Sequence, residues 1–455
     1  MLEKIFALAK HGTSVRTEII AGVTTFVTMV YILALNPSIL GASGMDKGAI
    51  LTATAVSSAI ACLAMALLAN KPFALSAGLG LNAYFAYTVC GQMGFSWQVA
   101  LTAVLVEGII FVVLSLTNIR EAIFNSIPAS LKTAVGVGIG FFITFIGLQS
   151  SGLIVDGPTL VSLFSLKASF ATGAFNTQGI AVLLTVVGTL LIAYMFIKKV
   201  KGYMLWGILL TWVIGMILQA VGVYIPNPKA GYYSLIPTAI FSMPASMTAT
   251  MFKFDFSFIS SHFTDFIVVL FAFLFVDIFD TIGTVIGCAE KSGMLDKDGK
   301  LPEIKGILLA DAIGTTVGSC FGTSTITTFV ESSSGIAEGG RTGLTSVVSG
   351  ILFLLALFFS PLFLTIPSFA TAPALIFVGF LMLQQVSKID WQDLVKAIPC
   401  FITITMMGFA YSISDGIAFG FVAYTILHLL TGRRKELSCL MYILTLIFIV
   451  KYFII

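Results

Sequence analysis

The feature that most constrains this chain is a series of apolar stretches, each about 18 to 22 residues long, that recurs along all 455 residues. A stretch of this length crosses a hydrocarbon core about 30 Å thick as a helix. Hydrophobic residues make up 58% of the chain and charged residues 10%, whereas soluble domains carry roughly a quarter charged residues. The sequence therefore predicts an integral membrane protein that crosses the bilayer many times, and it excludes a soluble enzyme with one anchor.

Charge and cysteine patterns exclude further classes of protein. With 24 Lys and Arg against 21 Asp and Glu, the net charge is only +3, which is too low for a nucleic-acid-binding surface. The six cysteines stand singly, without the paired spacing of metal or redox sites. The sequence also shows no nucleophile constellation or cofactor motif. We therefore expect no enzyme, no metal, no cofactor and no nucleic-acid partner.

The apolar segments fall into two sets of seven. The first set covers residues 18–36, 49–69, 77–93, 97–117, 131–150, 179–198 and 203–224. The second set covers residues 262–287, 306–322, 332–341, 343–366, 371–387, 395–412 and 415–431. A polar and aromatic connection at 225–261 separates the sets, and an apolar tail at 437–455 follows them. We expect this tail either to span the membrane or to lie at its interface.

The distribution of Lys and Arg predicts the orientation of these segments. Basic residues gather in the loops that would share one side of the membrane: Arg120, Lys132, Lys198, Lys199, Lys201, Lys291, Lys297, Lys300, Lys305, Lys388, Lys396, Arg433, Arg434 and Lys435. Such loops face the cytoplasm. If the N-terminus is cytoplasmic, seven crossings place the 225–261 connection outside and invert the second set. The sequence thus predicts an all-α fold of about 14 segments in a 7+7 inverted repeat.

Each half contains one segment too irregular for an ordinary span. The segments are the Gly-rich 73–85 and the Thr- and Ser-rich 323–340. In the second, β-branched residues give way to Ser and Gly, which predicts a short strand leading into a half-helix. Backbone breaks at membrane depth are tolerated only where they are buried or line a cavity. Paired breaks at matching places in two halves point to the substrate site of a transporter.

Carboxylates at membrane depth cost several kcal/mol, so each needs a reason. Asp277 and Asp280 lie three residues apart on one face of an otherwise apolar helix. Glu331 follows the predicted strand of the second break, where it would accept from a polar ligand or cap the half-helix. Asn82 is the corresponding polar residue of the first break. For Asn82 the alternative is a hydrogen bond between helices, and for either aspartate it is pairing with a neighbouring backbone or hydroxyl group.

Other charged residues are expected to have structural or coupling roles rather than to contact a substrate. Glu107 and Asp311 lie in apolar or small-residue helices, as structural or coupling residues. Glu338 and Arg341, three residues apart, would pair with each other. Asp415 is expected to be the N-cap of the helix that follows it.

Several acids and an amide suit a flat, neutral heterocycle with ring and exocyclic N–H groups, because carboxylates accept from such donors. Aromatic faces would stack on the ring, and the nearby aromatic residues are Phe73, Phe85, Phe279 and Phe329. An acid in this setting can also hold a proton, which would couple transport to the proton gradient. An inorganic anion would be poorly served by so many acids.

Four stretches carry a resemblance to a known family. They are His11 to Tyr31 with Asn36-Pro37, Gly78-Leu-Gly-Leu-Asn-Ala-Tyr-Phe85, Phe279-Asp-Thr-Ile-Gly-Thr284, and Gly322-Thr-Ser-Thr-Ile-Thr-Thr-Phe-Val-Glu-Ser-Ser-Ser-Gly335. Together they resemble the nucleobase–cation symporter superfamily, and most of all its AzgA-like permeases for guanine, hypoxanthine and adenine. Some relatives carry His one turn after the acid of the eighth segment. Here that residue is Thr284, so any proton coupling must use carboxylates.

The resemblance implies a substrate-binding core and a gate. The core would comprise 1–130 and 262–366, the gate 131–224 and 367–431, the extracellular connection 225–261 and the C-terminal tail 432–455. It also implies that Asn82, Glu331 and one aspartate contact the purine. Asp280 is favoured over Asp277 because it lies inside the matched motif. Phe85 and Phe329 are added as stacking residues, and Asp280, Glu331 and Asp277 as proton-coupling residues.

The predicted function is purine:proton symport through the cytoplasmic membrane by alternating access, with guanine or hypoxanthine as substrate and adenine as a further candidate. The proton gradient is the driving force, and the lipid bilayer and the purine are the partners. The sequence does not decide whether two copies form a homodimer through the gate. The alternatives are a uracil or xanthine permease of the same fold, and an anion transporter or channel of related architecture.

Overall fold

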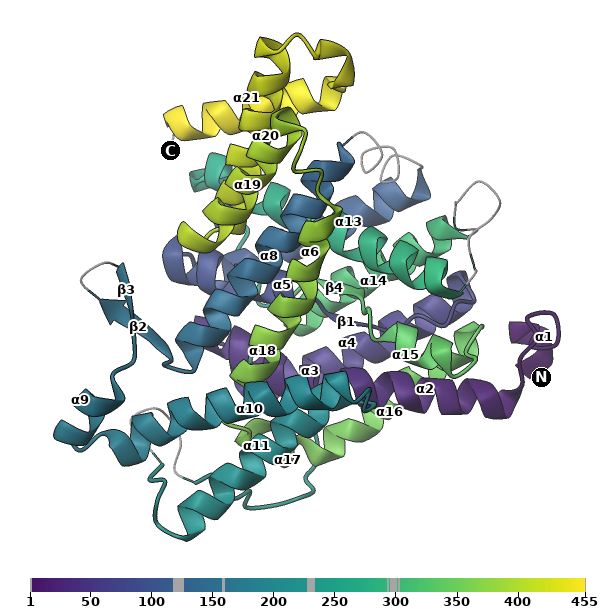
Figure 1. The fold of residues 1–455 in the computed structure, drawn as a ribbon. Helices are drawn as coiled ribbons and strands as arrows, with labels where there is room; N and C mark the ends of the chain where they lie inside the picture. Colours follow the sequence, from purple (N-terminus) through teal and green to yellow (C-terminus); the bar gives the residue numbers. More distant parts are fainter. Residues whose placement is uncertain are drawn as a thin grey trace.

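The computed structural model describes residues 2–117, 127–157, 160–226, 234–292, 294, 301 and 303–454 (Figure 1). The predicted basic loop residues Arg120, Lys297 and Lys300 lie outside the described residues. Within the described part, eleven helical stretches are long and apolar enough to cross a membrane. The chain is thus a mostly helical, multi-pass membrane protein.

In its described residues, the first half of the chain is mostly helical and contains three short strands. Its helices are α1 (Leu2–Phe6), α2 (Val15–Met29), α3 (Ile32–Leu40), α4 (Lys47–Leu68), α5 (Leu79–Ala83), the π-helix η2 (Tyr84–Gln92), α6 (Trp97–Leu116), α8 (Ala129–Ser150), α9 (Leu166–Ala171), the π-helix η3 (Phe175–Gly179), α10 (Ile180–Ile197) and α11 (Tyr203–Ala220). Its strands are β1 (Leu75–Ala77), β2 (Ile154–Gly157) and β3 (Leu160–Leu163).

The second half has one strand, β4 (Ile326–Thr328), among its described residues. Its helices are α12 (Ser257–Ser261), α13 (Phe263–Ser292), α14 (Ile304–Phe321), α15 (Ser332–Ala337), α16 (Gly343–Ala356), α17 (Ser360–Thr365), α18 (Ser368–Leu383), α19 (Leu394–Phe409), α20 (Ile413–Leu430) and α21 (Cys439–Ile454). Every predicted apolar segment contains a helix, with ends that differ by a few residues. The short strands predicted in the third and tenth segments are confirmed as β1 and β4.

Polar side chains cap the N-termini of several helices. Ser14, Asp46 and Ser96 accept hydrogen bonds from backbone N–H groups in the first turns of α2, α4 and α6. The prediction that Asp415 caps α20 is wrong, because Ser412 is the N-cap and its hydroxyl accepts from the Asp415 N–H at 3.2 Å. Asp415 instead lies in the first turn, where a negative charge is favourable near the helix N-terminus.

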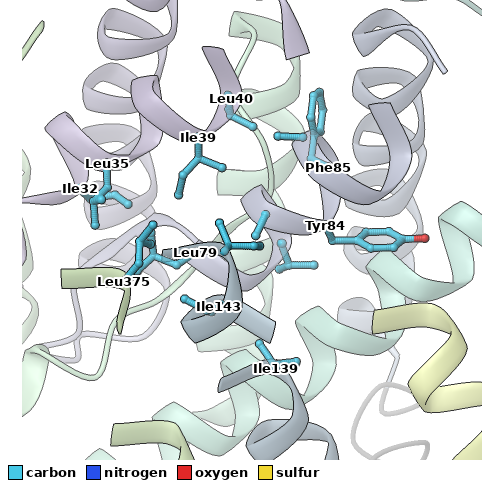
Figure 2. Close-up of a cluster of buried hydrophobic side chains, with 14 of the residues drawn as sticks. Ile32, Leu35, Ile39, Leu40, Leu79, Tyr84, Phe85, Ile139, Ile143 and Leu375 are labelled. Atoms are coloured by element: carbon cyan, nitrogen blue, oxygen red, sulfur yellow. The ribbon is translucent and has the colours of Figure 1, made fainter. Parts of the chain in front are cut away.

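The helices pack in two groups (Figure 1). In one group, α16 packs against α2 and α4, and α14 packs against α4 and α6. In the other, α18 packs against α8, α10 and α11, while α19 packs against α8 and α20. Figure 2 shows where the groups meet: Leu79 of α5 lies between α3 and side chains of α8 and α18, including Ile143 and Leu375. An apolar cluster therefore fills this part of the boundary between the groups.

A buried acid outside the breaks fixes α2 to α16. The Glu18 carboxylate is fully buried and accepts from the Arg341 N–H at 2.8 Å and from the Thr345 hydroxyl at 2.6 Å. It therefore satisfies polar groups at the start of α16, which a helix leaves without partners of its own. This role could not be inferred from local sequence, because Glu18 precedes α16 by more than 300 residues.

The C-terminal tail forms α21, which packs against α20. The Thr425 and Thr445 hydroxyls lie 2.7 Å apart, and the Phe421 and Phe448 rings meet edge to face. Exposed apolar side chains such as Leu446 cover the opposite side of α21. The two outcomes predicted for this tail, a span or an interfacial helix, both suit such an apolar helix.

Candidate functional site

The two interrupted segments meet at a pair of short antiparallel strands. Leu75, Ser76 and Ala77 of β1 lie opposite Thr328, Thr327 and Ile326 of β4. The pairing continues beyond the strands, because the Gly78 N–H donates to the Thr325 carbonyl at 3.0 Å and the Phe329 N–H donates to the Ala74 carbonyl at 3.0 Å. All six strand residues are buried, so the backbone groups freed by the breaks satisfy one another.

Asn82 follows β1 on α5 and is fully buried. Neither its amide nitrogen nor its amide oxygen has a hydrogen-bond partner among the described residues. Leaving a buried amide without partners costs about 1–3 kcal/mol, so native proteins seldom keep one without a purpose. A ligand that both donates and accepts would satisfy this side chain.

Glu331 follows β4 and immediately precedes α15. The Tyr31 hydroxyl donates to its Oε1 atom at 2.6 Å. Tyr31 lies in the break between α2 and α3, so the first segment also reaches this site. Tyr31 belongs to the first of the family motifs, but no role could be predicted for it, because its partner lies 300 residues away.

Asp280 lies on α13 beside the strand pair. A Cβ atom added to Gly78 would lie 3.4 Å from Asp280 Oδ2 and 2.9 Å from Thr327 Oγ1. Glycine at position 78 thus lets the backbone of the first break approach this carboxyl group closely. The helix α13 packs against both β4 and α15, and Glu331 immediately precedes α15. The structure therefore brings Asp280, Glu331 and the Gly78 backbone into one region.

Asp277 points to a different neighbourhood on α13. It is fully buried, and the Thr281 hydroxyl lies 3.0 Å from Asp277 Oδ1 and 2.7 Å from Asp311 Oδ1 on α14. Glu107 on α6 is buried on the same side of β4, where it accepts from the Thr325 hydroxyl at 2.7 Å. Asp277, Asp311 and Glu107 are therefore bound to hydroxyl groups around the strand pair.

The predicted aromatic residues lie in apolar surroundings. Phe85 is fully buried, packs edge-on against Phe273, and lies beside Leu40 in Figure 2. Phe329 is 6% exposed and belongs to the same large apolar cluster. The side chain of Phe279 lies outside the described residues. Stacking of Phe85 or Phe329 on a ligand stays a prediction.

Glu338 and Arg341 each have a partner other than the one that the sequence suggested. Glu338 forms an ion pair with Lys201, in the turn between α10 and α11. The Arg341 guanidinium donates to the Ile336 and Gly340 carbonyls, both at 2.7 Å, and so satisfies the C-terminal end of α15. Sequence spacing alone missed Lys201 because it belongs to the other half of the chain.

Comparisons with known proteins identify the family of this chain. The Permease family model matches residues 16–419. The guanine/hypoxanthine permease PbuG of Bacillus subtilis is 43% identical over 467 residues, covering 100% of this chain and 99% of the relative. The adenine permease AdeP of Escherichia coli is 40% identical, covering 99% of this chain and 96% of the relative.

Among solved structures, the transmembrane domain of the cyanobacterial bicarbonate transporter BicA has the same fold, with a TM-score of 0.65. It is 14% identical, with 88% of this chain and 96% of that chain covered. At such identity the likeness concerns the fold alone. Because the family model and the relatives span nearly the whole sequence, the chain belongs to the Permease family and to the nucleobase permeases within it.

Proposed function

We propose that this protein is a purine nucleobase:proton symporter that imports guanine or hypoxanthine, with adenine as a further candidate, by alternating access. The observation that carries the proposal is the fully buried Asn82 amide, which has no partner within the described part of the chain. Asn82 follows β1, Glu331 follows β4, and Asp280 lies near Gly78 at the end of β1. A purine edge offers adjacent donors and acceptors that match an amide and carboxylates. The two bacterial relatives, an adenine permease and a guanine/hypoxanthine permease, favour the same substrate class.

The finer architecture belongs to the same proposal. We assign about 14 segments to two inverted repeats, with a core at 1–130 and 262–366, a gate at 131–224 and 367–431, and a cytoplasmic N-terminus in the cytoplasmic membrane. The pairing of β1 with β4 and the two packing groups of helices support this division. The predicted gate includes α8, α10, α11, α18, α19 and α20. A homodimer would form through these helices.

Proton coupling is supported by the hydrogen count at Thr281. This residue has one hydroxyl hydrogen, which can point at only one of Asp277 and Asp311. The other contact is favourable when that carboxyl group carries a proton and donates to the Thr281 oxygen. The pair would thus hold a proton between α13 and α14, and Asp280 and Glu331 would be the remaining carboxyl groups of the relay.

The test is an uptake assay in cells that lack their own purine carriers, with labelled guanine, hypoxanthine, adenine, xanthine and uracil in parallel. We expect guanine or hypoxanthine to accumulate fastest and to be displaced by the unlabelled purine. Dominant uptake of uracil or xanthine would favour the alternative substrate class within the same fold. If sulfate or bicarbonate moves and no base accumulates, the proposal fails in favour of an anion transporter.

A further inference from the structure

The turn between α10 and α11 contacts the second half of the chain. Lys201 in this turn forms an ion pair with Glu338 at the C-terminal end of α15. The Lys201 side chain is 64% exposed and that of Glu338 is 26% exposed, so water reaches the pair. Next to it, a Cβ added to Gly202 would lie 3.0 Å from Val27 Cγ1 on α2. The turn therefore lies directly on α2 and α15.

The same turn reaches toward the proposed purine site. Tyr203 is the first residue of α11, and α11 packs against α2, which ends two residues before Tyr31. Its ring packs edge-on against Phe196 and Phe377, with centroids 5.2 Å and 5.8 Å apart. These aromatic partners belong to α10 and α18, so Tyr203 is fixed to the proposed gate while it faces the core.

The short helix α15 connects the ion pair to the site. Glu331 precedes its first residue, and Glu338 follows its last residue, seven positions after Glu331. On the core side, Gly335 leaves no room for a Cβ against the Ala21 carbonyl of α2, so α15 packs tightly on that helix. Because α15 is so short, a restraint on Glu338 also restrains Glu331.

The turn between α19 and α20 makes a corresponding contact with different chemistry. It lies on η2, where the Gln92 amide donates to the Ala410 carbonyl at 3.3 Å and the Thr88 hydroxyl donates to the Tyr411 carbonyl at 3.4 Å. Both turns contain a non-glycine residue with a left-handed backbone, Lys199 at φ 57° and Tyr411 at φ 54°. Each gate turn thus contacts the broken segment of the other repeat.

We infer that Lys201 is a positioning residue that holds α15 against the α10–α11 turn through its ion pair with Glu338. This contact closes the site at the end of the molecule that carries the N-terminus. It also fixes Glu331 relative to the gate. The inference rests on the proposed function, because closure has meaning only for alternating access. An exposed ion pair changes an equilibrium by about fivefold at most, so this contact would form and break readily during transport. The contact at η2, made to backbone carbonyls and without an ion pair among its described partners, would respond less to salt.

The experiment compares Lys201→Glu, Glu338→Lys and the double charge exchange, each combined with Ser334→Cys. Ser334 is half-buried on α15, one turn after Glu331. The readout is the rate at which a membrane-impermeant maleimide labels this cysteine in inside-out vesicles. The labelling of the native cysteines is measured in protein that keeps Ser334, and this background is subtracted. The matched control is Lys198→Glu, because Lys198 lies in the same turn over the Tyr194 ring.

We expect each single charge reversal to raise the labelling rate about threefold to fivefold and to raise the KM for hypoxanthine uptake more than it lowers Vmax. The double exchange should restore both values, Lys201→Arg should leave them near wild type, and Lys198→Glu should change neither. Equal labelling of all variants, or no restoration by the exchange, would overturn the role of Lys201. If the wild type takes up no purine, the proposed function fails, and the labelling rates alone then report on the ion pair.

Discussion

The two broken segments share a backbone arrangement but differ in chemistry. The first, made of β1, α5 and η2, packs among apolar side chains (Figure 2). It carries Asn82, whose amide has no partner among the described residues. The second, made of β4 and α15, presents Glu331, which already accepts from Tyr31. One half therefore holds a neutral amide that a ligand could hydrogen-bond, and the other holds an acid that already accepts a hydrogen bond from the protein.

This difference has energetic consequences. A buried amide without partners destabilises the ligand-free protein, so its replacement by an apolar residue costs function but not stability. A buried carboxyl group with a hydroxyl partner contributes to stability, and it must share or exchange that partner when a ligand binds. We propose that the two breaks, which pair through β1 and β4, divide the tasks of ligand recognition and charge.

The largest effect is expected from neutralising the acids near the strand pair. Asp280→Asn and Glu331→Gln should each lower the initial rate of hypoxanthine uptake by about 100-fold or more, because an amide donates where the carboxylate accepted and holds no exchangeable proton. The matched control is Asp265→Asn, an acid in the first turn of the same α13. Wild-type uptake by both site variants at normal membrane expression would show that the acidic half is misassigned.

A strong but smaller effect is expected from Asn82→Leu. Uptake should fall about 10-fold to 100-fold, since one good polar contact to the base is lost. The melting temperature of the purified, ligand-free protein should stay level or rise by about 1–3 °C. Asn36→Leu is the comparison, because the Asn36 amide donates to Thr54 and Thr323 at 2.7 Å and 2.9 Å and its loss should lower the melting temperature. A clear loss of stability in Asn82→Leu would indicate an internal partner for that amide.

Tyr31→Phe should have an intermediate effect. It removes only the hydroxyl that donates to Glu331, so uptake should fall about fivefold to tenfold and the melting temperature should drop slightly. Tyr194→Phe, which alters a tyrosine that is 60% exposed, controls for the loss of a hydroxyl as such. If Tyr31→Phe raised the melting temperature as Asn82→Leu is expected to do, the contrast between the two halves would disappear.

The smallest effect concerns a surface pair of the proposed gate. The Arg433 guanidinium donates to Asp393 at 2.7 Å, which holds the pKa of that carboxyl group below its usual range, and Lys396 adds to this. A lowered pKa in the folded protein means that the stabilisation is present above the ordinary value near 4 and is lost as pH falls through the lowered value. Asp393→Asn should therefore lower the melting temperature by about 1–2 °C at pH 7. This difference should shrink toward pH 3, and a difference that stays constant with pH would contradict the assignment.

The sequence allowed the helices and the short strands to be predicted well, because apolar length and Gly- or Ser-rich breaks are local signals. Pairing between distant segments was predicted less well. The Glu338–Arg341 pair was inferred from spacing, yet Lys201 lies closer in space, and the hydroxyl of Tyr31 was not connected with Glu331. The N-cap at Ser412 was missed because two neighbouring polar residues compete for that role. The β2–β3 hairpin lacked a hydrophobic alternation long enough to predict it.

Purified protein in liposomes with an imposed pH gradient tests the central claim most directly. With the outside acidic, labelled hypoxanthine should accumulate above its external concentration, and a protonophore should reduce this to equilibration. Unlabelled guanine should compete, and the Asn82→Leu protein should accumulate little. Accumulation that does not depend on the pH gradient would contradict proton symport. The absence of any purine uptake by the wild-type protein would contradict the proposed function as a whole.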